Sequence, residues 1–228
     1  GCSREPQNLL GRERAIIVRE VWAGSVGYIG VLATIVCTMI DLRVRPRLQW
    51  VIQPIGRGLA GMGVTPQLLT FIGLLVTVGG GVLLGFGWLR TGAAVALVGS
   101  VLDGLDGSVA RAAGKDSPRG ALLDAVSDRV GEVACFAGLA VAMTGNTRVL
   151  LLIVLALGGS MLVPYLRAKA EAEGLDGRGG LMGRAERVLL FTIGLLIGLV
   201  EPMLWVMVVA TWSTVGWRFF ETYRQLTP

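Results

Sequence analysis

The sequence contains no histidine, and this absence removes several kinds of site at once. Imidazole metal ligands, histidine general bases and Ser-His-Asp triads all depend on that side chain. Acid–base or metal chemistry in this chain must therefore use Asp, Glu, Lys, Arg or Tyr. Cysteine is scarce as well, with three widely spaced residues, Cys2, Cys37 and Cys135. Neither their number nor their spacing indicates a disulfide framework or a zinc site.

Charged residues are also few: they make up 16% of the 228 residues, whereas a soluble domain contains about a quarter. Hydrophobic residues reach 53%, and the mean hydropathy is +0.67. Long runs of Leu, Val, Ala and Gly indicate a multi-span membrane protein. The net charge of +5 favours contact with membrane lipids that carry anionic headgroups, or with phosphates. No basic face or recognised module points to nucleic acid, so we expect no nucleic-acid partner.

Apolar stretches recur along the chain and predict an all-α fold, a polytopic membrane helical bundle. An amphipathic segment at 48–66 is expected to lie along the membrane interface, and an apolar stretch at 22–40 predicts an extra N-terminal helix. The chain then divides into an N-terminal extension, 1–47, and a transmembrane domain, 48–228. Six core transmembrane helices are expected in that domain, at 68–89, 92–113, 120–143, 149–165, 188–200 and 203–215.

Basic residues concentrate in alternate connections between these stretches, while the intervening turns carry at most one Arg each. By the positive-inside rule, the basic side faces the cytoplasm. We therefore expect a multi-pass protein of the plasma membrane with its active site on the cytoplasmic side. The stretch 22–40 does not fit this alternation if it spans the membrane, so its topology stays open.

Small residues recur at four-residue spacing, for example Gly81 and Gly85. Such spacing lets membrane helices approach closely. Packing within one chain is one interpretation, and a contact face between two copies is the other. The second interpretation predicts a homodimer.

Four aspartates interrupt two neighbouring apolar stretches. Asp103 and Asp106 are three residues apart, and Asp124 and Asp128 are four apart, so each pair lies on one face of its helix. The two helices are consecutive and joined by a short turn, which folds the second pair back onto the first. Four anions in a low-dielectric place repel one another, and each is costly to bury unpaired. Divalent cations would cancel that charge, and ligands that are all oxygen suit Mg²⁺, Mn²⁺ or Ca²⁺.

Two other interpretations of the aspartates are weaker. They could cap helices or pair with nearby arginines in a wet loop, as Asp116 does in our reading, but the shared faces argue against this for the other four. They could also form the ion path of a cation transporter. Their position near helix ends, beside Gly107 and Arg111, favours an enzyme instead.

The motif around these aspartates resembles the signature of the CDP-alcohol phosphotransferase family at every defined position. Its residues here are Asp103, Asp106, Gly107, Ala110, Arg111, Gly120, Asp124 and Asp128. The resemblance implies an enzyme of phospholipid biosynthesis. The substituted phosphoryl group of a CDP-alcohol, often CDP-diacylglycerol (CDP-DAG), passes to an acceptor hydroxyl, and CMP leaves. Two Mg²⁺ ions, or Mn²⁺ in their place, would be held by Asp103, Asp106, Asp124 and Asp128.

The resemblance also implies roles for single residues. Asp128 would take the proton of the acceptor hydroxyl as the catalytic base. Gly107, Arg111 and Ser117 would contact the CDP-alcohol. The sequence GVTPQLLT is similar to the family's TPN-x-x-T pattern, so Pro66 and Gln67 are further candidates, although Gln67 replaces the Asn. A simple helix start at Thr65-Pro66 explains that sequence equally well.

The acceptor is indicated by the sequences PYLRAKAEAEGLDGRGG and GRAERVLL, which resemble those of phosphatidylinositol-phosphate synthases. By that resemblance Arg167, Arg187 and Arg218 would hold the phosphate of a phosphorylated polyol, namely inositol phosphate. The alternative is that these basic residues follow the positive-inside rule for cytoplasmic loops and have no role in binding the acceptor. Glycerol 3-phosphate, or the acceptor of a soluble inositol phosphodiester pathway, remains an open alternative.

Overall fold

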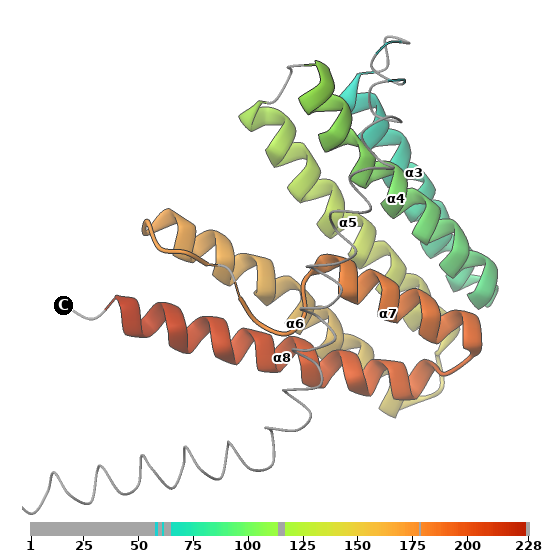
Figure 1. Cartoon of the computed structure of the whole chain (residues 1–228). Coiled ribbons are helices and arrows are strands. Elements are labelled where there is room, and N and C mark those ends of the chain that lie inside the picture. Colours follow the sequence, from blue (N-terminus) through green and yellow to red (C-terminus); the bar gives the residue numbers. More distant parts are fainter. Residues whose placement is uncertain (1–57, 59–60, 62–64, 114–116, 178, 227–228) are drawn as a thin grey trace, which may run out of the picture. The chain divides into compact units, whose positions relative to one another are not determined.

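The computed structural model describes residues 58, 61, 65–113, 117–177 and 179–226, and the regular structure within them is all α-helical. The prediction of an all-α fold is confirmed. The stretch 22–40 and nearly all of 48–66 lie outside the described residues, so both segments and the domain division remain predictions. The helices are α3 (Pro66–Gly85), α4 (Leu89–Ala113), α5 (Pro118–Ala142), α6 (Thr147–Ala172), α7 (Arg184–Ile197) and α8 (Val200–Gln225) (Figure 1).

Side-chain caps fix where three of these helices begin. Thr65 caps α3 and Ser117 caps α5, and in both helices a proline follows directly at the first helical position. Proline suits that position because its fixed φ matches the helix and its missing N–H would be unpaired there anyway. Asn146 caps α6 by accepting a hydrogen bond from the backbone N–H of Val149 at 3.2 Å.

Two helices extend beyond the apolar stretches that predict them. α6 continues from 165 to Ala172 through charged residues, where Arg167 pairs with Glu171 at 2.8 Å and Lys169 pairs with Glu173 at 2.5 Å. Ion pairs four residues apart stabilise exposed helical turns, which explains why this segment is helical rather than a loop. α8 likewise runs from Val200 to Gln225, so it begins before and ends after the apolar stretch 203–215.

The helices form two neighbouring groups. α3, α4 and α5 pack against one another, α6 packs against α8, and α7 contacts both α4 and α8 (Figure 1). The main buried cluster draws on all six described helices, with Leu84, Ala93, Leu139, Leu152, Leu195 and Leu204 among its members. A smaller cluster of Leu69, Leu105 and Val109 joins α3 to α4 beside the aspartate motif.

Three of the described helices, α3, α6 and α8, are long and apolar enough to cross a membrane. At most 39% of the most apolar window of each lies buried inside the protein, so most of that surface is left to contact lipid. α4 and α5 carry the charged motif, and α7 has only 14 residues. The chain is thus a membrane protein, while the count of six crossing helices remains a prediction.

Glycines let the helices around the aspartates approach closely. A Cβ atom added at Gly73 of α3 would lie 2.8 Å from the backbone nitrogen of Asp103 on α4. A Cβ added at Gly138 of α5 would overlap the carbonyl oxygen of Gly81 on α3. Gly81 therefore serves packing within the chain, as the first interpretation of the small-residue spacing has it. The distance between α3 and α4 at Asp103 is set by the absence of a side chain at position 73.

Replacing Gly73 with Ala should therefore lower the stability of the protein. The new methyl group meets backbone atoms that cannot rotate away, so we expect a loss of roughly 1–3 kcal/mol in the free energy of unfolding. Gly79→Ala on the same helix is the matched control, because nothing lies within 4 Å of a Cβ there. That control should be neutral or slightly stabilising, since alanine favours helix over glycine. Unfolding of the two purified variants in detergent compares them, and equal stability would contradict the close approach.

Candidate active site

Three of the four predicted metal ligands lie together at one end of α4 and α5. Asp103, Asp106 and Asp124 each offer an oxygen atom, and these atoms all lie within 4.8 Å of one another. Asp103 is 3% exposed and Asp106 is 8% exposed. The same-face spacing on two consecutive helices thus predicted this cluster.

The donor set of this cluster fits a divalent cation. It consists only of carboxylate oxygens, which hard cations such as Mg²⁺ and Mn²⁺ prefer. Within the described residues, Asp103 Oδ1 is buried and has no hydrogen-bond partner. A buried carboxylate oxygen without a partner is costly, and a bound cation removes that cost.

Helix α3 supports the cluster from one side. The hydroxyl of Thr70 donates a hydrogen bond to Asp106 Oδ2 and also reaches the backbone carbonyl of Pro66. Since Gly73 brings α3 close to α4, Thr70 lies one helical turn away from the point of closest approach. The hydrogen bond fixes the orientation of one carboxylate before any cation is bound.

Asp128, the predicted base, lies one turn further along α5 and is linked to the cluster by an arginine. Arg184 Nη2 is 3.0 Å from Asp103 Oδ2 and 2.5 Å from Asp128 Oδ1. Arg184 is the first residue of α7, so this contact ties a fourth helix of the site to α4 and α5. Its positive charge offsets the repulsion between the two carboxylates.

Opposite charges continue from Asp128 into the protein. Arg129 Nη1 is 3.9 Å from Asp128 Oδ2 and 3.8 Å from Glu132 Oε2. Glu132 in turn accepts two hydrogen bonds from Arg187, at 2.9 Å from Nε and 3.3 Å from Nη2. The side chain of Arg187 is 3% exposed, so this is a buried, bidentate ion pair.

A pocket lies beside this chain of charges, between α3, α4, α5, α7 and α8. Its polar lining includes Asp103, Asp128, Glu132, Arg184 and Arg187, and apolar residues such as Leu97, Phe136 and Met207 line the rest. One pocket therefore presents both the predicted base and a predicted phosphate-binding arginine. The lining as a whole is mostly apolar, and these charged side chains make up its smaller, polar part.

The predicted contacts to the CDP-alcohol lie near the ends of α3, α4 and α5. Pro66 is buried at the start of α3, and Gln67 beside it is exposed. Gly107 is partly buried on α4, and the Ser117 hydroxyl accepts a hydrogen bond from the Gly120 backbone N–H at 3.1 Å as the cap of α5. The side chain of Arg111 lies outside the described part of the chain. Their roles in nucleotide binding remain predictions.

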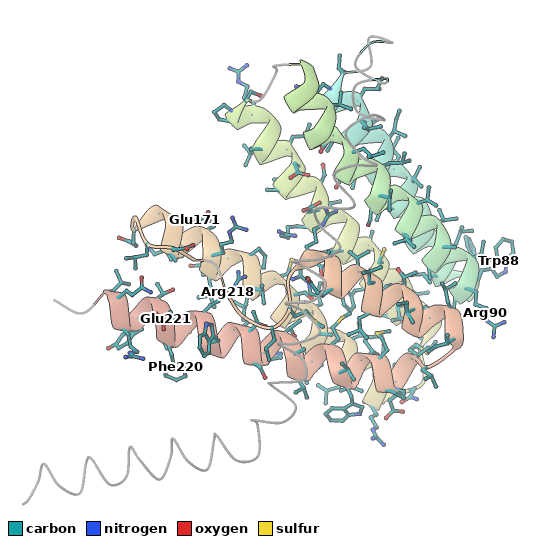
Figure 2. All side chains as sticks on the ribbon, viewed as in Figure 1. Trp88, Arg90, Glu171, Arg218, Phe220 and Glu221 are labelled. Atoms are coloured by element: carbon teal, nitrogen blue, oxygen red, sulfur yellow. The ribbon has the colours of Figure 1, made fainter. Side chains whose placement is uncertain are left out.

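The three predicted acceptor arginines come from three helices. Arg218 on α8 faces α6, where it donates a hydrogen bond to the carbonyl of Val163 at 2.7 Å, and it also donates one to the carbonyl of Gly179 at 2.9 Å (Figure 2). Both Arg167 and Arg187 are near enough to act electrostatically on Arg218. Arg187 lines the pocket, whereas Arg167 is half exposed and paired with Glu171.

The sequence reasoning missed three residues that the structure places at the site: Thr70, Glu132 and Arg184. Each carries a signal in hindsight. Thr70 is the last residue of the GVTPQLLT motif, and Glu132 follows Asp128 by four residues on the same face of α5. Arg184 precedes Arg187 by three residues on α7. Only the packing of α7 against α4 brings Arg184 to the aspartates, and periodicity within one helix does not reveal such a contact.

Comparison with known proteins places these residues in a family. Residues 63–217 match the family model described as CDP-alcohol phosphatidyltransferase. A phosphatidylinositol phosphate synthase of Mycobacterium marinum is 34% identical over 186 residues, which cover 76% of this chain and 80% of that protein. An archaetidylinositol phosphate synthase of Pyrococcus horikoshii is 31% identical over 189 residues, which cover 81% of this chain and 97% of that protein.

Solved structures agree with this assignment. The crystal structure of Mycobacterium tuberculosis phosphatidylinositol phosphate synthase in complex with manganese and citrate matches with a TM-score of 0.71 at 31% identity, covering 75% of this chain and 88% of that one. The same enzyme with CDP-DAG bound matches with a TM-score of 0.70 at 31% identity, covering 76% of this chain and 94% of that one.

Removing the Thr70 hydroxyl should weaken divalent-metal binding. In Thr70→Val the side chain keeps its shape but no longer orients Asp106. Loss of a residue that hydrogen-bonds a metal-ligating carboxylate typically lowers metal affinity by about ten- to hundredfold. Thr211→Val is the matched control, since Thr211 is equally buried and its hydroxyl bonds only the backbone carbonyls of Met207 and Val208 among the described residues. Mn²⁺ titration of both variants by calorimetry measures the change. Equal affinities would show that Thr70 does not support the metal site.

Proposed function

The chain belongs to the CDP-alcohol phosphatidyltransferase family, and from this premise we propose that it transfers the phosphatidyl group of CDP-DAG to a hydroxyl of inositol phosphate, with release of CMP. It is a metal-dependent membrane transferase of phospholipid biosynthesis. The lipid substrate, the acceptor and the residues that bind them are the parts that we propose.

The observation that carries the acceptor proposal is the shared pocket of Asp128 and Arg187. A phosphorylated acceptor can place its phosphate near a guanidinium and its hydroxyl near a carboxylate within one such pocket. Arg167 and Arg218 lie on the neighbouring helices and add positive charge on the same side. The two curated relatives differ in the lipid part of their names but share inositol phosphate, which supports the same acceptor here.

Asp128 takes the proton in the proposed reaction. The acceptor hydroxyl gives its proton to the Asp128 carboxylate while its oxygen forms a bond to the phosphorus atom that carries the lipid. The bond from that phosphorus to the CMP oxygen breaks, and CMP leaves with the electron pair. Divalent cations held by Asp103, Asp106, Asp124 and Asp128 would neutralise the diphosphate and the charge that develops on the leaving group.

Several finer features belong to the same proposal. We propose two ions per site, with Mg²⁺ as the usual metal and Mn²⁺ as a substitute, because four carboxylates exceed what one cation neutralises. Gly107, Arg111, Ser117, Pro66 and Gln67 contact the CDP-alcohol. We further propose that the protein acts as a homodimer in the plasma membrane. The distribution of basic residues favours a position of this site on the cytoplasmic side.

Asp128→Asn should lower the turnover number by about 10²–10⁴-fold, because the amide cannot accept the hydroxyl proton. Release of CMP from CDP-DAG and inositol phosphate in the presence of Mg²⁺ measures the rate. Glu201→Gln is the control. Glu201 pairs with Arg148 at a distance of 2.8 Å, and this ion pair lies away from the aspartates. Size-exclusion chromatography and thermal unfolding establish that both variants are folded. Turnover within threefold of the unchanged protein would remove Asp128 from the role of base.

An acceptor screen tests the substrate. With CDP-DAG and Mg²⁺ we expect CMP release with inositol phosphate, and much less with glycerol 3-phosphate or with inositol that carries no phosphate. Arg187→Lys keeps the charge but loses the planar fork, so the KM for inositol phosphate should rise roughly tenfold while the KM for CDP-DAG stays the same. Arg148→Lys serves as the control, because Arg148 is also ion-paired, with Glu201, but lies away from the aspartates. A preference for glycerol 3-phosphate, or equal shifts in both KM values, would contradict the proposal.

A further inference from the structure

Arg184 is the one residue among the described contacts that touches two carboxylates of the aspartate motif at once. From this geometry we infer that its guanidinium holds a cation position between Asp103 and Asp128, and that a divalent ion can take this position only by displacing it. Arg184 is then an internal competitor of one of the metal ions.

The distances support a direct competition for the same oxygen atoms. A single nitrogen, Arg184 Nη2, lies 3.0 Å from Asp103 Oδ2 and 2.5 Å from Asp128 Oδ1, so these oxygens cannot be more than 5.5 Å apart. Mg²⁺ holds its oxygen ligands at about 2.1 Å, so two ligands of one ion lie no more than about 4.2 Å apart. The guanidinium therefore limits the separation of the two oxygens and itself occupies the space between them.

The start of α7 is an unfavourable place for a positively charged side chain such as that of Arg184. Arg184 is the first residue of the helix, where the macrodipole favours negative side chains and disfavours positive ones. Glu186 in the same turn follows that rule, and Arg184 breaks it. The preceding residue, Gly183, provides no side-chain cap. Contact with the carboxylates is what stabilises a positive charge at this helix end.

Arg184 can also leave its position at little cost. Its side chain is 33% exposed, whereas those of Asp103 and Asp128 are only 5% and 8% exposed. The guanidinium thus reaches the carboxylates from the solvent side. The chain before α7 is anchored to α8, because the Thr214 hydroxyl accepts hydrogen bonds from the backbone N–H groups of Leu181 and Met182 at 3.1 Å, so withdrawal involves the Arg184 side chain alone. Withdrawal of the side chain needs no buried group to move.

The two ion positions should consequently differ in affinity. Asp103, Asp106 and Asp124 form the first ion position, and Asp103 Oδ1 has neither a hydrogen bond nor an ion pair in the described structure, so an ion can bind there while Arg184 stays in place. Asp128 Oδ1 also lacks a hydrogen bond, but Arg184 Nη2 lies 2.5 Å from it as an ion pair. The position next to Asp128 requires an exchange of one cation for another. The base therefore stays paired with Arg184 until the second ion arrives, which imposes an order on metal binding.

Titration of the whole purified protein with Mn²⁺ alone, without CDP-alcohol or acceptor, tests this inference. In Arg184→Gln we expect the Mn²⁺ affinity of the weaker class of sites to rise about tenfold, because the ion no longer has to replace two partly exposed ion pairs. The affinity of the tighter class should be unchanged. Arg148→Gln is the matched control, because it removes an ion-paired arginine from the first turn of α6, where its partner is Glu201 in the first turn of α8. Unchanged or weaker binding in Arg184→Gln, or an equal change in both variants, would overturn the inference.

Thermal unfolding provides a second readout. With a chelator present, Arg184→Gln should be less stable than the unchanged protein, because Asp103 and Asp128 lose their shared cation. Saturating Mn²⁺ should then stabilise the variant more than the unchanged protein. A variant that folds only with Mn²⁺ supports the inference, and one that stays unfolded in saturating Mn²⁺ contradicts it. Neither measurement involves the acceptor, so a wrong acceptor assignment would leave both results intact.

Discussion

Repulsion among carboxylates that share one end of two apolar helices is the constraint on which the rest of this structure depends. Asp103 and Asp106 are almost fully buried, and Asp124 and Asp128 face them from the next helix. Burial of like charges without compensation would unfold a bundle of this kind, because each buried charge costs several kcal/mol. A hydrogen bond from α3, an arginine from α7 and divalent cations together make the arrangement stable.

Compensation of charge extends beyond the carboxylate cluster. From Asp103 through Arg184, Asp128, Arg129 and Glu132 to Arg187, negative and positive side chains alternate without a break. Each inner member of the series touches two partners, so the removal of one leaves two charges less well compensated. The series runs from the aspartate cluster to the buried arginine of the pocket, and it explains why so many charged residues are concentrated in a chain that is otherwise strongly apolar.

Much of the fold and of the site could be predicted from the sequence. Patterns within one helix predict local structure, but they do not predict contacts between residues far apart in the chain. The all-α fold, the helix start at Thr65-Pro66 and the clustering of Asp103, Asp106 and Asp124 follow from local patterns, and those patterns predicted them correctly, whereas the role of Ser117 as a helix cap was not predicted. The contacts of Arg184 and the pairing of Glu132 with Arg187 join residues more than 50 positions apart, and no periodicity encodes such contacts. The helical extension after residue 165 was missed because its stability comes from ion pairs rather than from apolar side chains.

The absence of a side chain at Gly73 has a consequence for how such proteins can diversify. The helices that carry the aspartates are locked against α3 at backbone distance, so a larger residue there would shift the ligands themselves. The arginines proposed for the acceptor come from α6, α7 and α8; α6 and α8 pack against each other, whereas α7 also contacts α4. Divergent evolution can therefore alter the proposed choice of alcohol through α6 and α8 while the aspartate cluster stays unaltered.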